Sequence, residues 1–226
     1  MALRSILFPL LFGVAGTAVL LGLGFWQVGR LAEKEAYLAE IDERISKAPV
    51  TLPDNPDPAQ DRFLSVEANG RFAGPEIDVL ASRKTYGAGF RVISVFETTD
   101  GRRILVDRGF LPTDQRGEDR GQGNARIVGN LHWPDEVDGY TPEPDERTKM
   151  WFARDVPAMA DALGTEPVLI VLRETSETDP VVTPFPVDSS GIPNDHLEYA
   201  ITWFSLAAVW IGMTLYLLWR INRRTA

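Results

Sequence analysis

The sequence predicts an α+β membrane protein in which two transmembrane helices flank a compact, antiparallel, β-rich extracytoplasmic domain with one short helix. Three observations predict this class. Two long stretches, one near each end of the 226 residues, carry no charged side chain. Between them lie short segments rich in β-branched and aromatic residues, separated by turn residues. One apolar segment of that middle part starts after an Asp and stops at a Gly, as a capped helix does.

The first uncharged stretch covers residues 5–29. About 20 apolar residues form a helix that crosses a hydrocarbon core of roughly 30 Å. A secretory signal is the alternative, but its apolar region is typically about 7 to 15 residues long and precedes a small-residue cleavage site. Here the run is longer and leads into Phe25, Trp26 and Arg30 without such a site. The sequence therefore predicts an uncleaved transmembrane helix over 5–29.

A juxtamembrane helix is predicted over residues 30–48. Leu31, Leu38, Ile41 and Ile45 are spaced as on one helical face, among good helix formers of mixed charge. The helix should end before Pro49, because proline disfavours helical geometry in the preceding residue. Several prolines between 49 and 58 predict a linker.

The extracytoplasmic domain is predicted over residues 49–195. Asp100-Gly101 indicates a hairpin, because both residues tolerate the backbone angles of tight turns. Asp155 and Gly164 would cap a helix between them. Segments 113–124 and 134–149 are predicted to be polar loops. Strands are expected at 63–72, 77–82, 91–97, 103–107, 126–133 and 168–172.

The second transmembrane helix is predicted over residues 197–219, followed by a cytoplasmic tail at 220–226. Aromatic residues lie near both ends of this run, as is typical of membrane interfaces. The two outer flanks carry arginine and no acidic residue, whereas all 32 Asp and Glu lie within residues 27–198. Because short Arg-rich flanks stay in the cytoplasm, both termini are predicted to be cytoplasmic and the domain periplasmic.

The composition excludes several kinds of chemistry. With no cysteine there is no disulfide, thiolate zinc site, iron–sulfur cluster or cysteine nucleophile. A net charge of −9 without a basic patch argues against nucleic acid as a partner. The sequence lacks the G-x-S-x-G, H-E-x-x-H and phosphate-loop patterns, so no catalytic residue is predicted. The acidic stretch at 135–146 does not have EF-hand spacing, so a solvated loop is the better interpretation.

Polar and aromatic residues are expected to meet where the two spans leave the membrane. Because the spans are antiparallel, the end of the first lies at the same interface as the start of the second. Residues four apart share a helical face, as do 26 and 30, or 199 and 203. The residues concerned are Trp26, Gln27 and Arg30 of the first span and Asn194, His196, Tyr199 and Trp203 of the second.

Such a site suits haem, whose macrocycle is apolar, whose iron binds imidazole and whose propionates prefer cations. His196 would be the axial ligand and Arg30 a propionate partner. The alternative is that Trp26, Arg30 and Tyr199 only anchor the helices at the interface, with His196 solvated. His132, at the end of a strand, is expected to be structural or exposed, since it has no partner cluster.

At these residues the sequence resembles the Surfeit-locus family of cytochrome c oxidase assembly factors. The motifs are Gly24-x-Trp26-Gln27-x-x-Arg30, Gly89-Phe90-Arg91-Val92, Val106-Asp107-Arg108-Gly109-Phe110, and Asn194-Asp195-His196-Leu197-x-Tyr199-Ala200-x-Thr202-Trp203-Phe204. Two positions depart from the family pattern: Phe110, where the family more often has Trp, and Asp195, where a second Asn is common.

The resemblance implies a non-catalytic role in the maturation of a haem-copper oxidase, in a bacterial inner membrane. Haem a, bound transiently with its iron on His196, would be delivered to or stabilised in the catalytic subunit. The haem a tail could extend along the second span toward Leu206 and Val209. If His196 is not the ligand, His132 or a methionine such as Met213 becomes the candidate. Partners would be that subunit, membrane lipid and the enzyme that makes haem a. The alternative is a cofactor-free scaffold that holds an oxidase subunit.

Overall fold

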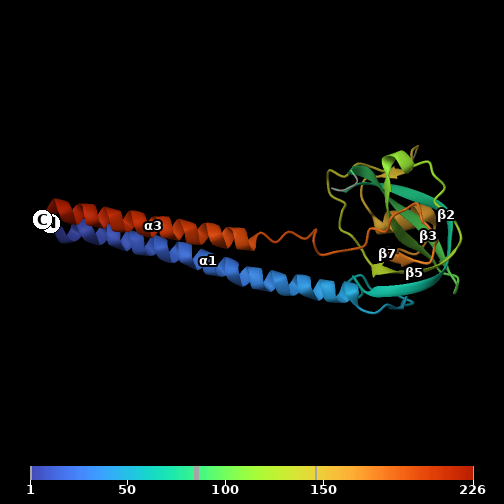
Figure 1. Ribbon diagram of the computed structural model, residues 1–226, viewed down its shortest axis with the longest axis horizontal. Helices are drawn as coiled ribbons and strands as arrows, with labels where there is room; N and C mark the ends of the chain where they lie inside the picture. The colour runs from blue at the N-terminus through green and yellow to red at the C-terminus, as the bar shows by residue number, and fades with distance from the viewer. Residues whose placement is uncertain (1, 84–86, 146, 226) are drawn as a thin grey trace. The chain divides into compact units, whose positions relative to one another are not determined.

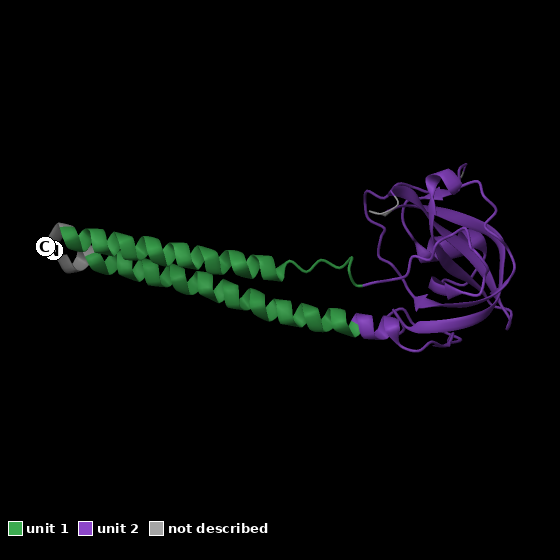
Figure 2. Cartoon of the chain, viewed as in Figure 1, with its two compact units in different colours: residues 1–40, 189–226 green, residues 41–188 purple. Residues whose placement is uncertain are grey.

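The computed structural model describes residues 2–83, 87–145 and 147–225. The chain divides into two units, which Figure 2 shows in different colours. A helical unit comprises residues 1–40 and 189–226, and a β unit comprises residues 41–188. The fold class predicted from the sequence is confirmed, because two apolar terminal helices flank a β-rich region with one short helix.

The helical unit consists of most of α1 (Ala2–Ser46) and all of α3 (His196–Thr225). Both helices are long and apolar enough to cross a membrane. The single helix α1 covers both the span predicted at 5–29 and the juxtamembrane helix predicted at 30–48. It ends three residues before Pro49, as the restriction on residues before proline predicts. Its last residues, from Ile41, belong to the β unit.

Helices α1 and α3 run antiparallel, side by side (Figure 1). Near one end the Trp210 indole Nε1 donates a hydrogen bond of 3.1 Å to the Gly13 carbonyl oxygen. Further along, the Phe25 and Phe204 rings meet edge to face, 5.4 Å apart. Glycine permits this approach: a methyl group on Gly13 would collide with Thr214, and one on Gly24 would come within 2.6 Å of the Phe204 ring. Small residues therefore allow the helices to pack closely.

The β unit is built on a closed ring of five strands. The ring runs from β2 (Ser65–Arg83) through β3 (Gly87–Thr98), β4 (Arg103–Pro112), β7 (Leu169–Thr175) and β5 (Asn124–Leu131) back to β2. All neighbours are antiparallel except β4 and β7, which are parallel. Closure leaves these five strands without an open edge. The short strands β1 (Val50–Thr51) and β6 (Met150–Trp151) pair in parallel with β2.

Alternate residues of the strands point to two apolar clusters, as the period of two in a strand requires. Ile104 and Val106 of β4 belong to the first cluster, which takes residues from all five ring strands and fills the interior. Leu105 belongs to the second cluster, which lies under the helix α2 (Val156–Leu163). The second cluster therefore covers one outer face of the ring with α2.

The capping and hairpin predictions are confirmed. The Asp155 carboxylate accepts a hydrogen bond from the Ala158 amide at the start of α2, and Gly164 ends the helix in the left-handed conformation. Strands β3 and β4 pair antiparallel around Gly101, whose φ is +88°. A 3-10 turn, η1 (Thr113–Gln115), follows β4.

The two strands predicted at 63–72 and 77–82 form one strand, β2. An irregularity between Phe72 and Glu76, where Gly74 has a φ of +88°, bends β2 without ending it. Strand β5 pairs with β2 before the bend, over residues 65–71, whereas β3 pairs with β2 on both sides of it, over 70–72 and 76–83. Gly74-Pro75 therefore acts as a bulge within the strand rather than as a turn between strands.

Candidate functional site

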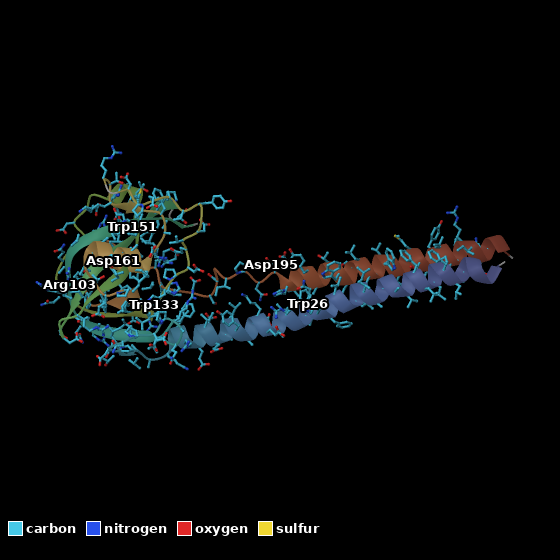
Figure 3. All side chains as sticks on the ribbon, turned by 180° about the vertical axis from the view of Figure 1, so that it is seen from behind. Trp26, Arg103, Trp133, Trp151, Asp161 and Asp195 are labelled. Atoms are coloured by element: carbon cyan, nitrogen blue, oxygen red, sulfur yellow. The ribbon has the colours of Figure 1, made fainter. Side chains whose placement is uncertain are left out.

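The candidate site lies where α3 begins beside the middle of α1. Residues Pro193, Asn194 and Asp195 precede α3, and turn and capping residues of this kind favour a helix start. The Asp195 carbonyl accepts a hydrogen bond of 3.2 Å from the Tyr199 amide, which begins the helix. Figure 3 shows Trp26 of α1 level with Asp195, at the start of α3. His196 is thus fixed as the first residue of α3.

His196 is hydrogen-bonded across the helix pair to Gln27. The imidazole Nδ1 lies 2.8 Å from the Gln27 side-chain oxygen Oε1. That oxygen can only accept, so Nδ1 carries the proton. In the neutral tautomer with this hydrogen bond, the lone pair of the ring is on Nε2. Gln27 is 8% exposed, so its amide is held between the helices.

The other residues predicted for this site take different positions. Trp26 and Tyr199 are 57% and 55% exposed, and Trp203 is half-buried on the same helix as Tyr199. The Arg30 guanidinium lies 2.6 Å from the Glu33 carboxylate, and both side chains are more than half exposed. Asn194 has a buried side-chain oxygen without a hydrogen-bond partner. The structure therefore joins Gln27 to His196 directly and leaves the remaining side chains around them.

An apolar cavity of about 640 Å³ lies between the two helices, further along the pair from His196. Leu206 and Val209 of α3 line it, together with Gly16 and Val19 of α1. The sequence placed Leu206 and Val209 along a haem tail but did not predict a cavity. The signal that could have found it is the run of small residues on α1, which includes Ala15 and Gly16.

His132, the chain's other histidine, is buried in the β unit. Its side chain is 9% exposed and its ring stacks on Phe63, with the centroids 5.3 Å apart. Burial, followed by the positive charges of Arg154 and Arg62, lowers the His132 pKa to about 3. The ring is therefore neutral near pH 7, and its buried Nδ1 has no hydrogen-bond partner. This placement fits the structural role expected for it.

A buried ion-pair cluster connects two of the motifs that carry the family resemblance. The Asp107 carboxylate, fully buried on β4, lies 2.6 Å from Nε of Arg91 on β3. The same Asp107 oxygen lies 3.1 Å from Nη1 of Arg154. Burial lowers the Arg91 pKa, and the Arg154 charge adds to that effect against the opposing Asp107. The two motifs thus meet in the folded β unit, which sequence reasoning did not predict.

The expectation that the acidic stretch at 135–146 is a solvated loop is wrong for Glu136. Its carboxylate forms an ion pair with Arg154 and accepts a hydrogen bond from the Arg154 amide. Burial alone would raise the Glu136 pKa, but the bonds and charge of Arg154 lower it below the usual value. Among the described residues, no group of three or more His, Cys, Asp or Glu could hold a metal ion. Glu146, also part of that acidic stretch, lies outside the described residues.

A second group of charges holds the loop predicted at 113–124 against β2. Arg120 lies 2.6 Å from Asp78, and Arg116 lies 2.8 Å from the same carboxylate. Arg108, only 1% exposed, lies 3.2 Å from Glu76 and stacks on the Phe72 ring. Asp107 and Arg108 are consecutive residues of β4, so they serve clusters on opposite faces of the strand.

Comparison with known proteins finds one family whose model matches most of the chain. The model of the SURF1 family matches residues 14–208. A SURF1-like protein of Monosiga brevicollis is 31% identical, over 88% of this chain and 83% of its own length. Surfeit locus protein 1 of Rattus norvegicus is 29% identical, over 92% of this chain and 74% of its own length. A SURF1-like protein of Rickettsia felis is 28% identical, over 90% and 93% respectively.

Proposed function

Because this chain belongs to the SURF1 family, known as cytochrome c oxidase assembly factors, we propose that it is a membrane-anchored haem a carrier for such an oxidase. In this role it binds haem a through His196 and delivers it to, or stabilises it in, the catalytic subunit. The role is non-catalytic, and haem a is cargo that the protein must both hold and release.

The observation that carries this proposal is the hydrogen bond between His196 and Gln27. Histidines that bind metals usually donate their second ring N–H to an oxygen acceptor, which fixes the tautomer and the ring orientation. Gln27 Oε1 accepts from Nδ1 at 2.8 Å and so leaves the Nε2 lone pair available for iron. The donor set of this site therefore fits a haem, with His196 as the axial ligand and Gln27 as its positioning residue.

The surroundings supply contacts for the rest of the ligand. Arg30 is exposed and could exchange its ion pair with Glu33 for a propionate. Trp26 on α1 and Tyr199 and Trp203 on α3 offer aromatic surface in the same part of the helix pair. The apolar cavity lined by Leu206 and Val209 suits an isoprenoid tail, because its surface is almost entirely hydrocarbon.

The proposed orientation places both termini in the cytoplasm and the β unit in the periplasm of a bacterial inner membrane. It rests on the arginines beyond the outer ends of the two uncharged runs and on the acidic residues, which all lie within residues 27–198. The site would then lie at the periplasmic surface of the membrane. The proposed partners are the catalytic subunit of the oxidase, membrane lipid and the enzyme that makes haem a.

The experiment that tests the proposal is the absorption spectrum of the chain purified from cells that make haem a. We expect a Soret band, with less than one haem per chain because a carrier releases its cargo. His196→Ala should abolish or shift the band, whereas His132→Ala, at the chain's other histidine, should retain it. Circular dichroism establishes that each variant is folded. An unchanged spectrum in folded His196→Ala would contradict ligation by His196, and haem-free wild type would favour a cofactor-free scaffold.

A further inference from the structure

A second, polar cleft lies in the β unit, beside the residues of β2 that pair with both β3 and β5. Its volume is about 650 Å³, within the range of sites that bind small ligands or a few side chains. It is lined by the part of β2 that pairs with both β3 and β5, by the turn between β3 and β4, and by the start of β5. These elements all belong to the β unit, whereas His196 belongs to the helical unit.

Three arginines line the cleft against a single lining carboxylate. Arg71 binds one oxygen of Glu97 through Nε at 2.9 Å and Nη2 at 2.6 Å. Arg126 forms an ion pair with Glu67, which lies outside the lining. Arg103 is the third arginine, and Figure 3 shows it at the surface of the β unit. With both carboxylates engaged by other arginines, Arg103 leaves an excess of one positive charge.

The bonding of Arg103 is incomplete. Its Nε is buried and donates no hydrogen bond, since the nearest acid oxygen, Glu97 Oε1, lies 3.6 Å away. Its Nη2 makes only a long contact of 3.5 Å with the Leu163 carbonyl. The side chain as a whole is 42% exposed, and Arg103 is among the residues that line the cleft. A guanidinium presents a planar fork of donors that matches a carboxylate with two parallel bonds.

Gly70 lines the cleft at a point where β2 and β3 approach closely. A methyl group there would collide with the carbonyl of Glu97 and approach the Cα of Thr98. Close by, Asn69 and Asn124 contribute amide groups to the lining, which can bond to the N–H and C=O of a peptide. The cleft thus combines neutral hydrogen-bonding groups with three arginines, of which Arg103 shares its carboxylate, Glu97, with Arg71.

We propose that this cleft binds an acidic side chain of a peptide segment from a partner protein, with the carboxylate on Arg103. One excess cation matches one carboxylate, and the neutral amides match the peptide backbone beside it. The chain as a whole carries −9, so an acidic partner is attracted here by local rather than overall charge. This inference is independent of haem binding.

The test is a titration of the full chain in detergent, labelled with ¹⁵N-arginine. The probes are acetyl-Ala-Glu-Ala-amide and its Gln counterpart. Binding of each peptide is detected through the arginine Nε–H resonances of the chain. We expect saturable shifts with the Glu peptide at least about fivefold tighter than with the Gln peptide. Arg103→Gln should weaken binding of the Glu peptide about tenfold, the effect of losing one charge-assisted contact. Arg147→Gln, an exposed arginine outside the cleft, is the matched control and should change nothing.

A second variant tests the same site by gain of binding. Glu97→Gln removes the carboxylate that Arg71 and Arg103 share, so the Glu peptide should bind more tightly. Equal binding of the Glu and Gln peptides would overturn the proposal. So would equal weakening by Arg103→Gln and Arg147→Gln, which would indicate a general charge effect. If acetate or inorganic phosphate binds as tightly as the Glu peptide, the cleft is a simple anion site and the peptide assignment is wrong.

Discussion

Gln27 and His196 are 169 positions apart in the sequence, yet their side chains share a 2.8 Å hydrogen bond between α1 and α3. The bond fixes which imidazole nitrogen carries the proton. It also gives the site a specific geometry, because Gln27 is held with only 8% of its surface exposed. The first prediction follows from that bond.

Gln27→Ala should weaken haem retention while leaving the iron ligand in place. Loss of an oxygen that orients a metal-bound histidine typically costs about 10- to 100-fold in affinity. The haem occupancy of the purified protein and its rate of transfer to apomyoglobin measure this. Gln27→Glu keeps an acceptor at the same position and should restore retention. If Gln27→Ala binds haem as the wild type does, the hydrogen bond has no role in haem binding.

The sequence predicted the two helices and led us to propose residues for this site, but it did not predict how those residues contact one another. Charge-free runs identify the spans, because the hydrocarbon core excludes charge over a known length. Which groups of His196, Gln27, Arg30 and Tyr199 meet depends on the rotation of each helix, which no periodicity in the sequence specifies. Arg30, for example, forms its ion pair with Glu33 on the same helix, α1, and not with a residue of α3.

In the β unit too, features set by adjacent residues could be predicted, whereas contacts between distant segments could not. Asp100-Gly101 and the Asp155 cap were predictable because a turn or a cap is decided by a few adjacent residues. The parallel pairing of β4 with β7 was not, because strand order depends on contacts between distant segments. The ion pair of Arg91 with Asp107 could not be predicted for the same reason, although each lies within a motif already noted.

The second prediction is that Asp107→Asn strongly destabilises the fold. The neutral amide would leave Arg91 and Arg154 buried without their shared carboxylate, and breaking a buried ion pair in this way costs about 3–5 kcal/mol. Thermal unfolding of the full chain in detergent, followed by near-UV circular dichroism, measures the loss. Asp138→Asn, in an exposed loop, is the matched control and should leave the midpoint unchanged. Equal midpoints for the two variants would contradict the structural role of Asp107.

The third prediction concerns helix packing. Gly13→Ala should destabilise the helix pair, because the added methyl group would overlap Thr214 and come within 2.9 Å of its Cβ, which cannot move without the backbone. Gly22→Ala is the matched control, since nothing lies within 4 Å of a methyl group there. In a helix interior alanine is favoured over glycine by about 1 kcal/mol, so the control should be neutral or stabilising. Detergent unfolding of both variants compares them, and a stabilised Gly13→Ala would contradict the close packing.

The fourth prediction is that His132 makes the stability of the protein depend on pH. In the folded state burial lowers the His132 pKa to about 3, whereas in the unfolded chain this pKa is about 6.5. Between these values the unfolded state binds the proton and the folded state does not. Stability is therefore fully present above about pH 6.5 and falls as the pH drops, by up to about 1.4 kcal/mol per pH unit, until about pH 3. Urea unfolding of the full chain in detergent between pH 7 and pH 4 measures this slope.

His132→Phe keeps a ring against Phe63 and removes the titration, so it should flatten the pH dependence of stability by about one proton. A variant with the same slope as the wild type would mean that the acid sensitivity comes from the buried carboxylates, such as Glu136, instead.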